Sequence, residues 1–310
     1  MSRSGAEIIP GEGAEEARRA ILSRFARGAS IETSARSVDA LDSHRDGLPP
    51  GTRIYVPWIP GAAPGHCVEL SRRLKEFGLR PVPHIAAREI ESAEGARNLI
   101  GQLGQEVGID EALLIAGDRA DPKGPYADAE ALLRTGLFEA HGIARLGFAG
   151  YPEGHPRIGP DILSQSLSAK LDGATAQGIA PFIVSQFCFD GAVILAWLRG
   201  LRQRGVSAPV WIGMAGPAKI GTLIRYGMRC GIGNSLRALS AHPRQITQLL
   251  SSQGPESVAA ALAGADPALG IAGWHLYSFG GFVRTAEWIR KVAEGKVLLE
   301  ADGGFGVLEP

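Results

Sequence analysis

A glutamine interrupts an otherwise apolar stretch at residues 181–191, which read PFIVSQFCFDG. A side-chain amide both donates and accepts hydrogen bonds, so Gln186 suits a place near the end of a strand where it faces a ligand. Asp190 and Gly191 follow and are suited to turning the chain into a helix. The plainer alternative is that Gln186 hydrogen-bonds a neighbouring loop inside the fold.

Polar side chains follow other short apolar runs in the same way. They are Glu32, Trp58, His84, Asp118, Tyr151, Glu153, His155 and Tyr277. Among them Glu32 lies on a strand flanked by Ser and Thr, which favours a functional role over a surface carboxylate. Asp118 fits a turn cap equally well. His84 is also compatible with a satisfied core histidine, and His155 with a residue that braces a proline-flanked loop.

Other chemistries have little support in the sequence. It contains no HExxH, Walker or GxSxG motif, and its histidines and cysteines lack zinc-site spacing. Cys188 lies two residues after Gln186, but without an evident base partner a buried thiol is favoured over a nucleophile. We therefore expect no metal site.

Short apolar runs alternate with amphipathic segments along the chain, a pattern typical of repeated βα units. The expected strands are 29–33, 53–58, 80–85, 112–117, 144–150, 181–187, 209–213 and 271–277. Eight such units in a chain of 310 residues predict a (β/α)₈ TIM barrel. No strand is followed by GxGxxG, the usual sign of the competing doubly wound sheet. In a TIM barrel the strand-end residues collect at one mouth.

We expect residues 1–310 to form one barrel domain. Residues 1–28 are predicted to be a helical extension, 217–265 to contain extra helices between the seventh and eighth strands, and 296–310 to be a tail whose last ten residues are poorly ordered.

Charge and cysteine content narrow the class of protein. The 32 basic and 32 acidic residues balance, which argues against nucleic acid or a membrane surface as a partner. Three cysteines make no disulfide framework, the N-terminal residues contain no apolar signal core, and the most hydrophobic window is broken by polar residues. A cytoplasmic protein that acts on a small molecule is expected, and a homo-oligomer is compatible with the sequence.

Taken together, the strand-end motifs resemble the methylenetetrahydrofolate reductase family over nearly the whole predicted barrel. GYPEGHP is similar to the family's AYPExHP, and SQFCFD to its TQxxFD. SIET, PHIAA, LLIAGD, GPYADAEAL and WHLYSF are weaker matches that occur in the family's order. The resemblance implies reduction of 5,10-methylenetetrahydrofolate to 5-methyltetrahydrofolate by NADH or NADPH, normally through FAD, in one-carbon metabolism and methionine biosynthesis.

The resemblance also implies roles for single residues. Glu32 would be the general acid that protonates the folate nitrogen leaving the one-carbon bridge, since buried carboxyl groups can donate near neutral pH. Gln186 would hold the pterin, with Tyr277 also on the substrate, and Asp118 would contact the pterin or flavin. The positions that match FAD-binding ones are His84, Gly117, Asp118, Tyr126, Ala127, Tyr151, His155 and Lys170.

Several positions depart from the family pattern. Ala116 replaces an arginine, and the helix before Lys170 matches one residue short. Gly280-Gly281 replace an asparagine-arginine pair, for which Arg284 is a candidate substitute in space. These changes predict weak FAD binding or its absence. The alternatives are a flavin-independent reductase that uses NADH directly, a folate-dependent one-carbon or methyl transferase, and a folate-binding accessory protein.

Overall fold

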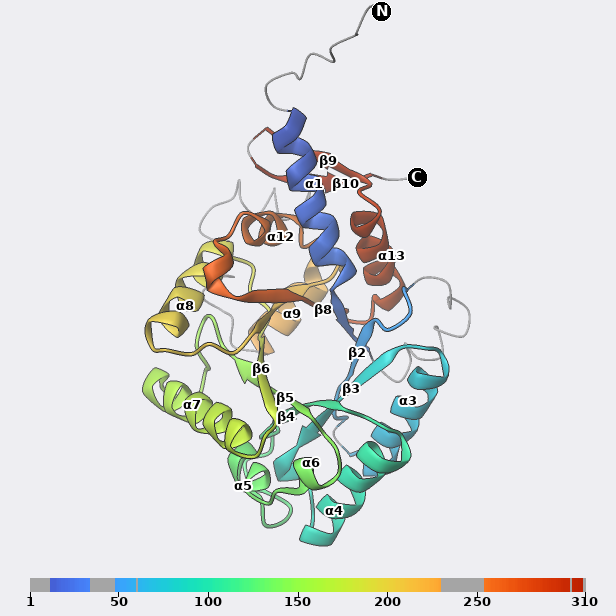
Figure 1. Cartoon of the computed structure of the whole chain (residues 1–310), viewed down its shortest axis with the longest axis vertical. Helices are drawn as coiled ribbons and strands as arrows, with labels where there is room; N and C mark the ends of the chain where they lie inside the picture. The colour runs from blue at the N-terminus through green and yellow to red at the C-terminus, as the bar shows by residue number, and fades with distance from the viewer. Residues whose placement is uncertain (1–11, 34–47, 60, 230–253, 302, 309–310) are drawn as a thin grey trace, which may run out of the picture.

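A computed structural model provides the structure of the chain (Figure 1). It describes all residues except 1–11, 34–47, 60, 230–253, 302 and 309–310.

Eight parallel strands close into a barrel in the order of the sequence. They are β1 (Ser30–Glu32), β2 (Arg53–Val56), β3 (Arg80–Ala86), β4 (Glu111–Ile115), β5 (Arg145–Gly150), β6 (Ala180–Ser185), β7 (Val210–Ala215) and β8 (Ile271–Tyr277). β8 pairs with β1, which completes the ring. The predicted (β/α)₈ TIM barrel is confirmed, and each predicted strand overlaps an observed one.

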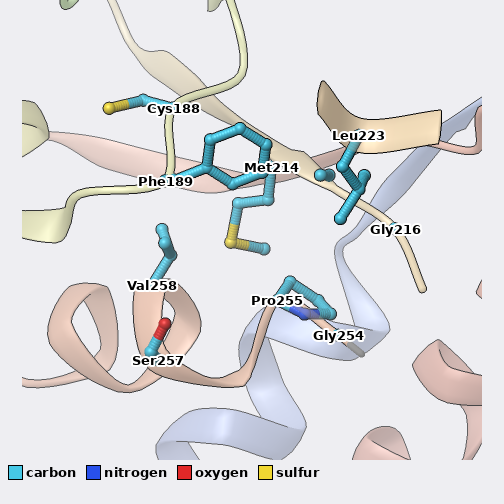
Figure 2. A pocket seen from close by; sticks show the side chains of 10 residues that line it. Cys188, Phe189, Met214, Gly216, Leu223, Gly254, Pro255, Ser257 and Val258 are labelled. Atoms are coloured by element: carbon cyan, nitrogen blue, oxygen red, sulfur yellow. The ribbon is translucent and has the colours of Figure 1, made fainter. Parts of the chain in front are cut away.

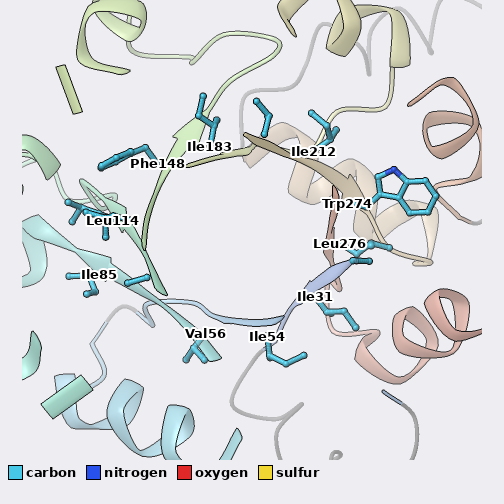
Figure 3. Packing of buried hydrophobic residues seen from close by; sticks show 14 of the residues in the cluster. Ile31, Ile54, Val56, Ile85, Leu114, Phe148, Ile183, Ile212, Trp274 and Leu276 are labelled. Carbon is cyan, nitrogen blue, oxygen red and sulfur yellow. The ribbon is translucent and has the colours of Figure 1, made fainter. Parts of the chain in front are cut away.

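Alternate side chains of each strand face opposite ways, as strand geometry requires. One set points outward to the helices, and Figure 3 shows Ile31, Ile54, Ile85 and Leu114 turned away from the barrel axis. The other set packs inside the barrel. This inner cluster consists of Tyr55, Val82, Leu113, Phe182, Val184 and Trp211, with Ile115 against it. The interior is therefore a filled core, and a ligand can reach only its ends.

The helices surround the barrel between the strands (Figure 1). The longer ones are α1 (Glu12–Arg27), α3 (Pro64–Glu76), α4 (Ala93–Gly101), α7 (Pro160–Ala176), α8 (Gly191–Gln203), α9 (Ile220–Arg229), α12 (Glu256–Ala263) and α13 (Phe282–Ala293). The short helices are α5 (Ala129–Leu133), α6 (Leu137–Ala140), the 3₁₀ turns η2 (Ala87–Glu89) and η4 (Pro267–Leu269), and the π-helical η3 (Gln102–Glu106).

Side-chain caps fix where several helices begin. Ser92 caps α4 through a hydrogen bond from Gly95 N, and Asp128 caps α5 through one from Ala131 N. Asp190 accepts from two backbone N–H groups at the start of α8. This confirms that the residues after Gln186 turn the chain into a helix.

The two chain ends extend the barrel on one side. The predicted N-terminal extension contains α1, which packs along α13 and stacks Phe25 on Trp274 of β8, with ring centroids 5.3 Å apart. The prediction for the tail is wrong. β9 (Val297–Leu299) and β10 (Phe305–Val307) pair antiparallel, because Phe305 provides an apolar anchor that is buried near Trp288.

The extra sequence between β7 and β8 contains α9 and α12, and the part of this prediction that falls on 230–253 lies outside the described residues. Within the described residues, no helix is long and apolar enough to cross a bilayer.

The N-terminal end of the barrel is closed by a charged cluster. Glu111 is fully buried, and its Oε2 lies 3.2 Å from Arg53 Nε, 3.2 Å from Arg80 and 3.6 Å from Arg145 Nε. Each of the four is the first residue of its strand. Arg53 and Arg145 also lie over the ring of Trp211. This end is occupied by a carboxylate and the three arginines that surround it, which leaves the opposite end for a ligand.

Candidate functional site

Glu32 is the last residue of β1 and lies at the carboxyl end of the barrel. Ile31 points outward into the core around the helices, so Glu32 on the alternate side points inward. In register it lies between Tyr55 of β2 and Tyr277 of β8. Its side chain is 25% exposed. The carboxyl group thus reaches both the barrel interior and the solvent-facing mouth.

Two buried histidines lie beneath this carboxyl. His275 of β8 is 1% exposed, and its Nε2 lies 4.0 Å from Glu32 Oε2. Its other ring nitrogen, Nδ1, is 2.9 Å from Ser30 Oγ. The Tyr55 ring contacts both imidazoles, with centroids 4.3 Å from His275 and 5.9 Å from His84. These five side chains, from strands β8, β1, β2 and β3, form one polar group that we call the acid cluster.

His84 belongs to the acid cluster and is 8% exposed. Burial lowers the pKa of its imidazole from 6.5 to about 4; the nearby Glu32 charge opposes this shift, and His275 adds to it. His84 is therefore neutral at physiological pH. The sequence placed it among FAD-binding positions, but its side chain lies within the barrel beside Glu32.

Gln186 is the first residue after β6 and is half-buried. Its Oε1 accepts a hydrogen bond from Phe187 N at 3.1 Å, which leaves the amide N–H donors for other partners. Tyr277 donates from its hydroxyl to Ser185 O at 3.1 Å. That bond ties the end of β8, next to Glu32, to the residue before Gln186. The structure thus brings Glu32, Gln186 and Tyr277 to the same mouth.

A second group of predicted residues comes from the loops after β4 and β5. Tyr151 and His155 meet edge to face, with centroids 5.2 Å apart. Burial and the Arg157 charge lower the pKa of His155, and the Asp118 charge opposes them. Asp118 is exposed, so the two loops share a charged, open surface. Gly117 has a φ of 93°, a conformation that favours glycine, and turns the chain there.

The other FAD-matched residues lie away from this surface. Tyr126 is buried in the outer hydrophobic core, and the Ala127 carbonyl accepts a hydrogen bond from Arg88. Lys170 lies on α7 with Nζ 5.8 Å from the ring of Phe148, whose side chain points outward in Figure 3. Burial lowers the pKa of this lysine, opposed by the charges of acidic residues near α5. Lys170 therefore lies on the helix side of the sheet.

Aromatic rings line one side of the mouth. Phe279 lies 5.0 Å from Phe187, 4.6 Å from Tyr226 and 6.1 Å from Tyr277, measured between centroids. It is the one non-glycine residue with positive φ (45°) in the described part of the chain. Such strain costs about 1–3 kcal/mol and persists only where surrounding contacts hold it. Partly exposed rings of this kind offer a stacking surface to a flat heterocycle.

The loop after β8 also shows what replaces the expected asparagine-arginine pair. Gly280 has a φ of 84°, and Gly281 precedes the first residue of α13. Arg284 is exposed in the first turn of that helix, beside Gly281. A cation is thus present near the position at which the family pattern has its asparagine-arginine pair.

Cys188 and the pocket next to it offer no further chemistry. The thiol is 1% exposed and burial raises its pKa, as expected for an inert buried cysteine. The pocket lies between this loop, β7 and α12, with Phe189 and Met214 inside it (Figure 2). Its free volume of about 20 Å³ is room for a water molecule. Among the described residues, no three potential metal ligands cluster.

Sequence reasoning missed His275, Ser30 and Tyr55 as members of the acid cluster. A signal was present, because His275 lies two residues before Tyr277 and Ser30 two before Glu32, so each pair shares a strand face. What the sequence lacks is the register that sets Ser30 opposite His275.

No family model matches the chain. Three solved structures similar to it are a dihydropteroate synthase from Thermus thermophilus, a 3-dehydroquinate dehydratase from Aquifex aeolicus and a putative phosphonomutase from Burkholderia cenocepacia. Their identities are 13%, 10% and 11%, and their TM-scores 0.46, 0.45 and 0.46. The matches cover 86%, 86% and 89% of this chain and 91%, 97% and 98% of the others. Likenesses this distant carry no argument about activity, which must come from the site itself.

Proposed function

We propose that this chain reduces 5,10-methylenetetrahydrofolate to 5-methyltetrahydrofolate, with the hydride passing directly from a nicotinamide dinucleotide to the folate. The observation that carries the proposal is the position of Glu32. Its carboxyl group is partly exposed at the barrel mouth, it is backed by buried imidazoles, and Gln186 lies at the same mouth. An acid and an amide at one mouth are the pair that this reaction needs.

The chemistry has two steps. Glu32 donates a proton to the folate nitrogen that leaves the one-carbon bridge, and the carbon remains on the other nitrogen as an iminium cation. A hydride from the nicotinamide then adds to that carbon and gives the methyl group, with the oxidised dinucleotide as second product. The proton and the hydride together account for both hydrogens added.

Gln186 and the aromatic rings would hold the two substrates in place. The amide of Gln186 offers a donor and an acceptor to the edge of the pterin. The ring of Phe279 and its aromatic neighbours supply a surface for a flat ring, which we assign to the nicotinamide or the pterin. Asp118, exposed on the loop after β4, is placed to contact the pterin's polar groups.

The described residues do not fit FAD as a set. Of the matched positions, His84 is enclosed in the acid cluster, Tyr126 is in the outer core, and Lys170 is on the helix side of the sheet. Ala116 also lacks the family's guanidinium. A dinucleotide cofactor would lose several charge-assisted contacts, each worth about 1.5–3 kcal/mol. We therefore favour the flavin-independent route and derive no step through FAD.

The test is steady-state reduction by purified protein with no flavin added. We expect methylenetetrahydrofolate-dependent oxidation of NADH or NADPH, formation of 5-methyltetrahydrofolate, and intersecting double-reciprocal plots, because both substrates must be bound together. Parallel plots with stoichiometric bound FAD would support the flavin route instead. Folate binding without nicotinamide oxidation would support a transferase or an accessory protein.

A further inference from the structure

The imidazole of His275 lies between Ser30 and Glu32 inside the barrel. The register of β1 and β8 places Ser30 opposite His275, and Glu32 opposite Tyr277 one pleat further on. The imidazole is hydrogen-bonded at Nδ1, and its buried Nε2, which has no hydrogen-bond partner among the described residues, faces Glu32. It is 1% exposed, so water does not compete freely for its nitrogens.

The two contacts of Ser30 favour one position for the ring hydrogen of His275. The Ser30 hydroxyl donates to Trp274 O at 3.4 Å. Having used its only hydrogen there, Ser30 Oγ accepts from His275 Nδ1, 2.9 Å away. A neutral imidazole with hydrogen on Nδ1 has a lone pair on Nε2. That lone pair faces Glu32 Oε2 at 4.0 Å.

Among the described residues, no lysine or arginine forms an ion pair with Glu32. Tyr55, His84 and Tyr277 are the other titratable groups facing it from β2, β3 and β8. His84 is neutral at physiological pH, because burial holds its pKa at about 4. The interior arginines lie at the opposite end of the barrel, where Glu111 binds them. In the described part of the chain, the Nε2 lone pair of His275 is therefore the group that lies against the Glu32 carboxyl.

We propose that His275 is a positioning residue for Glu32, which accepts a hydrogen bond at Nε2 from the proton-donating carboxyl group and so holds that group directed at the mouth. This inference rests on the proposed function for its catalytic meaning. The 4.0 Å separation exceeds a hydrogen bond by about 1 Å, and contacts of this kind commonly tighten when substrate binds.

The first experiment is nitrogen NMR of the histidine side chains in the ¹⁵N-labelled full chain, with His275→Gln to identify the signals. We expect His275 to carry its hydrogen on Nδ1. We also expect the Ser30→Ala variant to show a mixture of tautomers. A wild-type signal with hydrogen on Nε2 would overturn the proposal, because that nitrogen would then donate to a carboxylate.

The second experiment measures the pH dependence of folate reduction in wild type, Ser30→Ala and His275→Gln. Loss of the Nε2 acceptor should move the alkaline limb of the rate profile to lower pH by about one unit, the effect of one ordinary hydrogen bond. Ser92→Ala, which removes the cap of α4, is the matched control: it should lower stability without moving the limb. Unchanged limbs in both cluster variants would contradict the proposal.

The two experiments separate the inference from the function on which it rests. If the chain does not reduce the folate, the proposed function fails, while the NMR spectrum still decides where the His275 proton lies. If the folate is reduced and the spectrum shows hydrogen on Nε2 of His275, the proposed function is supported and the positioning role of His275 is contradicted.

Discussion

Each end of the barrel interior contains a carboxylate, and the two carboxylates have different surroundings. At the N-terminal end, Glu111 contacts three arginines and has no exposed surface. At the C-terminal mouth, Glu32 is partly exposed, and the described residues place it beside His275 and the neutral His84 and pair it with no arginine or lysine. A carboxylate enclosed by guanidinium groups suits a structural element, whereas a partly exposed carboxyl group beside imidazoles suits proton transfer. The same residue type thus contributes stability at one end and, in the proposed function, chemistry at the other.

The largest effect should come from Glu32→Gln. Gln keeps the size of the side chain and removes the acidic proton, so we expect folate reduction to fall by about 10²–10⁴-fold, measured as kcat. Folate binding and the urea midpoint should stay near wild type. Glu91→Gln, at a side chain that is 77% exposed, is the control for losing a carboxylate. Turnover within a few-fold of wild type would remove Glu32 from the mechanism.

For Glu111→Gln we expect the reverse of the Glu32→Gln result, namely a loss of stability with unchanged kcat. Three guanidinium groups lose their shared anion, and breaking a buried pair typically costs about 3–5 kcal/mol. We expect the low end of this range, because the arginine side chains are 20–34% exposed. Urea unfolding measures it, and kcat per folded molecule should be unchanged. Glu130→Gln breaks a surface pair with Arg134 and should cost under about 1 kcal/mol. A Glu111 variant that is stable but inactive would contradict the assignment of a purely structural role to this carboxylate.

The acid cluster should make stability fall at acidic pH through His84. The unfolded chain protonates this histidine near pH 6.5, while in the folded protein its pKa is about 4. Its stabilising contribution is therefore full above pH 6.5 and decreases as the pH falls toward 4. The loss reaches about 3 kcal/mol over that interval.

Urea unfolding at about pH 7 and about pH 4.5 measures this contribution. The free energy of unfolding at about pH 7 should exceed that at about pH 4.5, and this difference should be smaller by about 2–3 kcal/mol in His84→Asn than in wild type. His141→Asn, a substitution outside the acid cluster, is the control and should leave the difference intact. Equal differences in wild type and His84→Asn would mean that the folded protein accommodates the charged imidazole.

The barrel was predictable from the sequence because its signals are local. Apolar runs of strand length, such as 112–117, and amphipathic stretches between them depend only on neighbouring residues. The count of eight units then implied closure. The tail was mispredicted because its glycines obscure a short hairpin, which is stabilised by Phe305 packing near Trp288, far away in the sequence.

The candidate site was predictable only in part. Glu32 and Gln186 are marked by polar side chains at the ends of apolar runs. The pairing of Glu32 with His275 depends on the register between the first and last strands, which no local pattern contains. Lys170 shows that a motif match does not predict where a side chain lies. A motif match assigned it to a cofactor, but the side of α7 on which it lies follows from how that helix packs on Phe148.

The smallest effect, and the one that best separates binding from structure at the mouth, is expected for Gln186→Ala. The substitution leaves the pterin edge without its partner, which costs about 1–3 kcal/mol, or roughly 5- to 150-fold in folate affinity. Because Gln186 Oε1 also accepts from Phe187 N, a modest loss of stability should accompany it. Gln186→Glu keeps the acceptor and loses the amide donors, so folate KM in the two variants shows which half of the amide is used. An unchanged KM with a large drop in Tm would make Gln186 a structural residue, and the functional part of the mouth would shrink to Glu32 and its histidines.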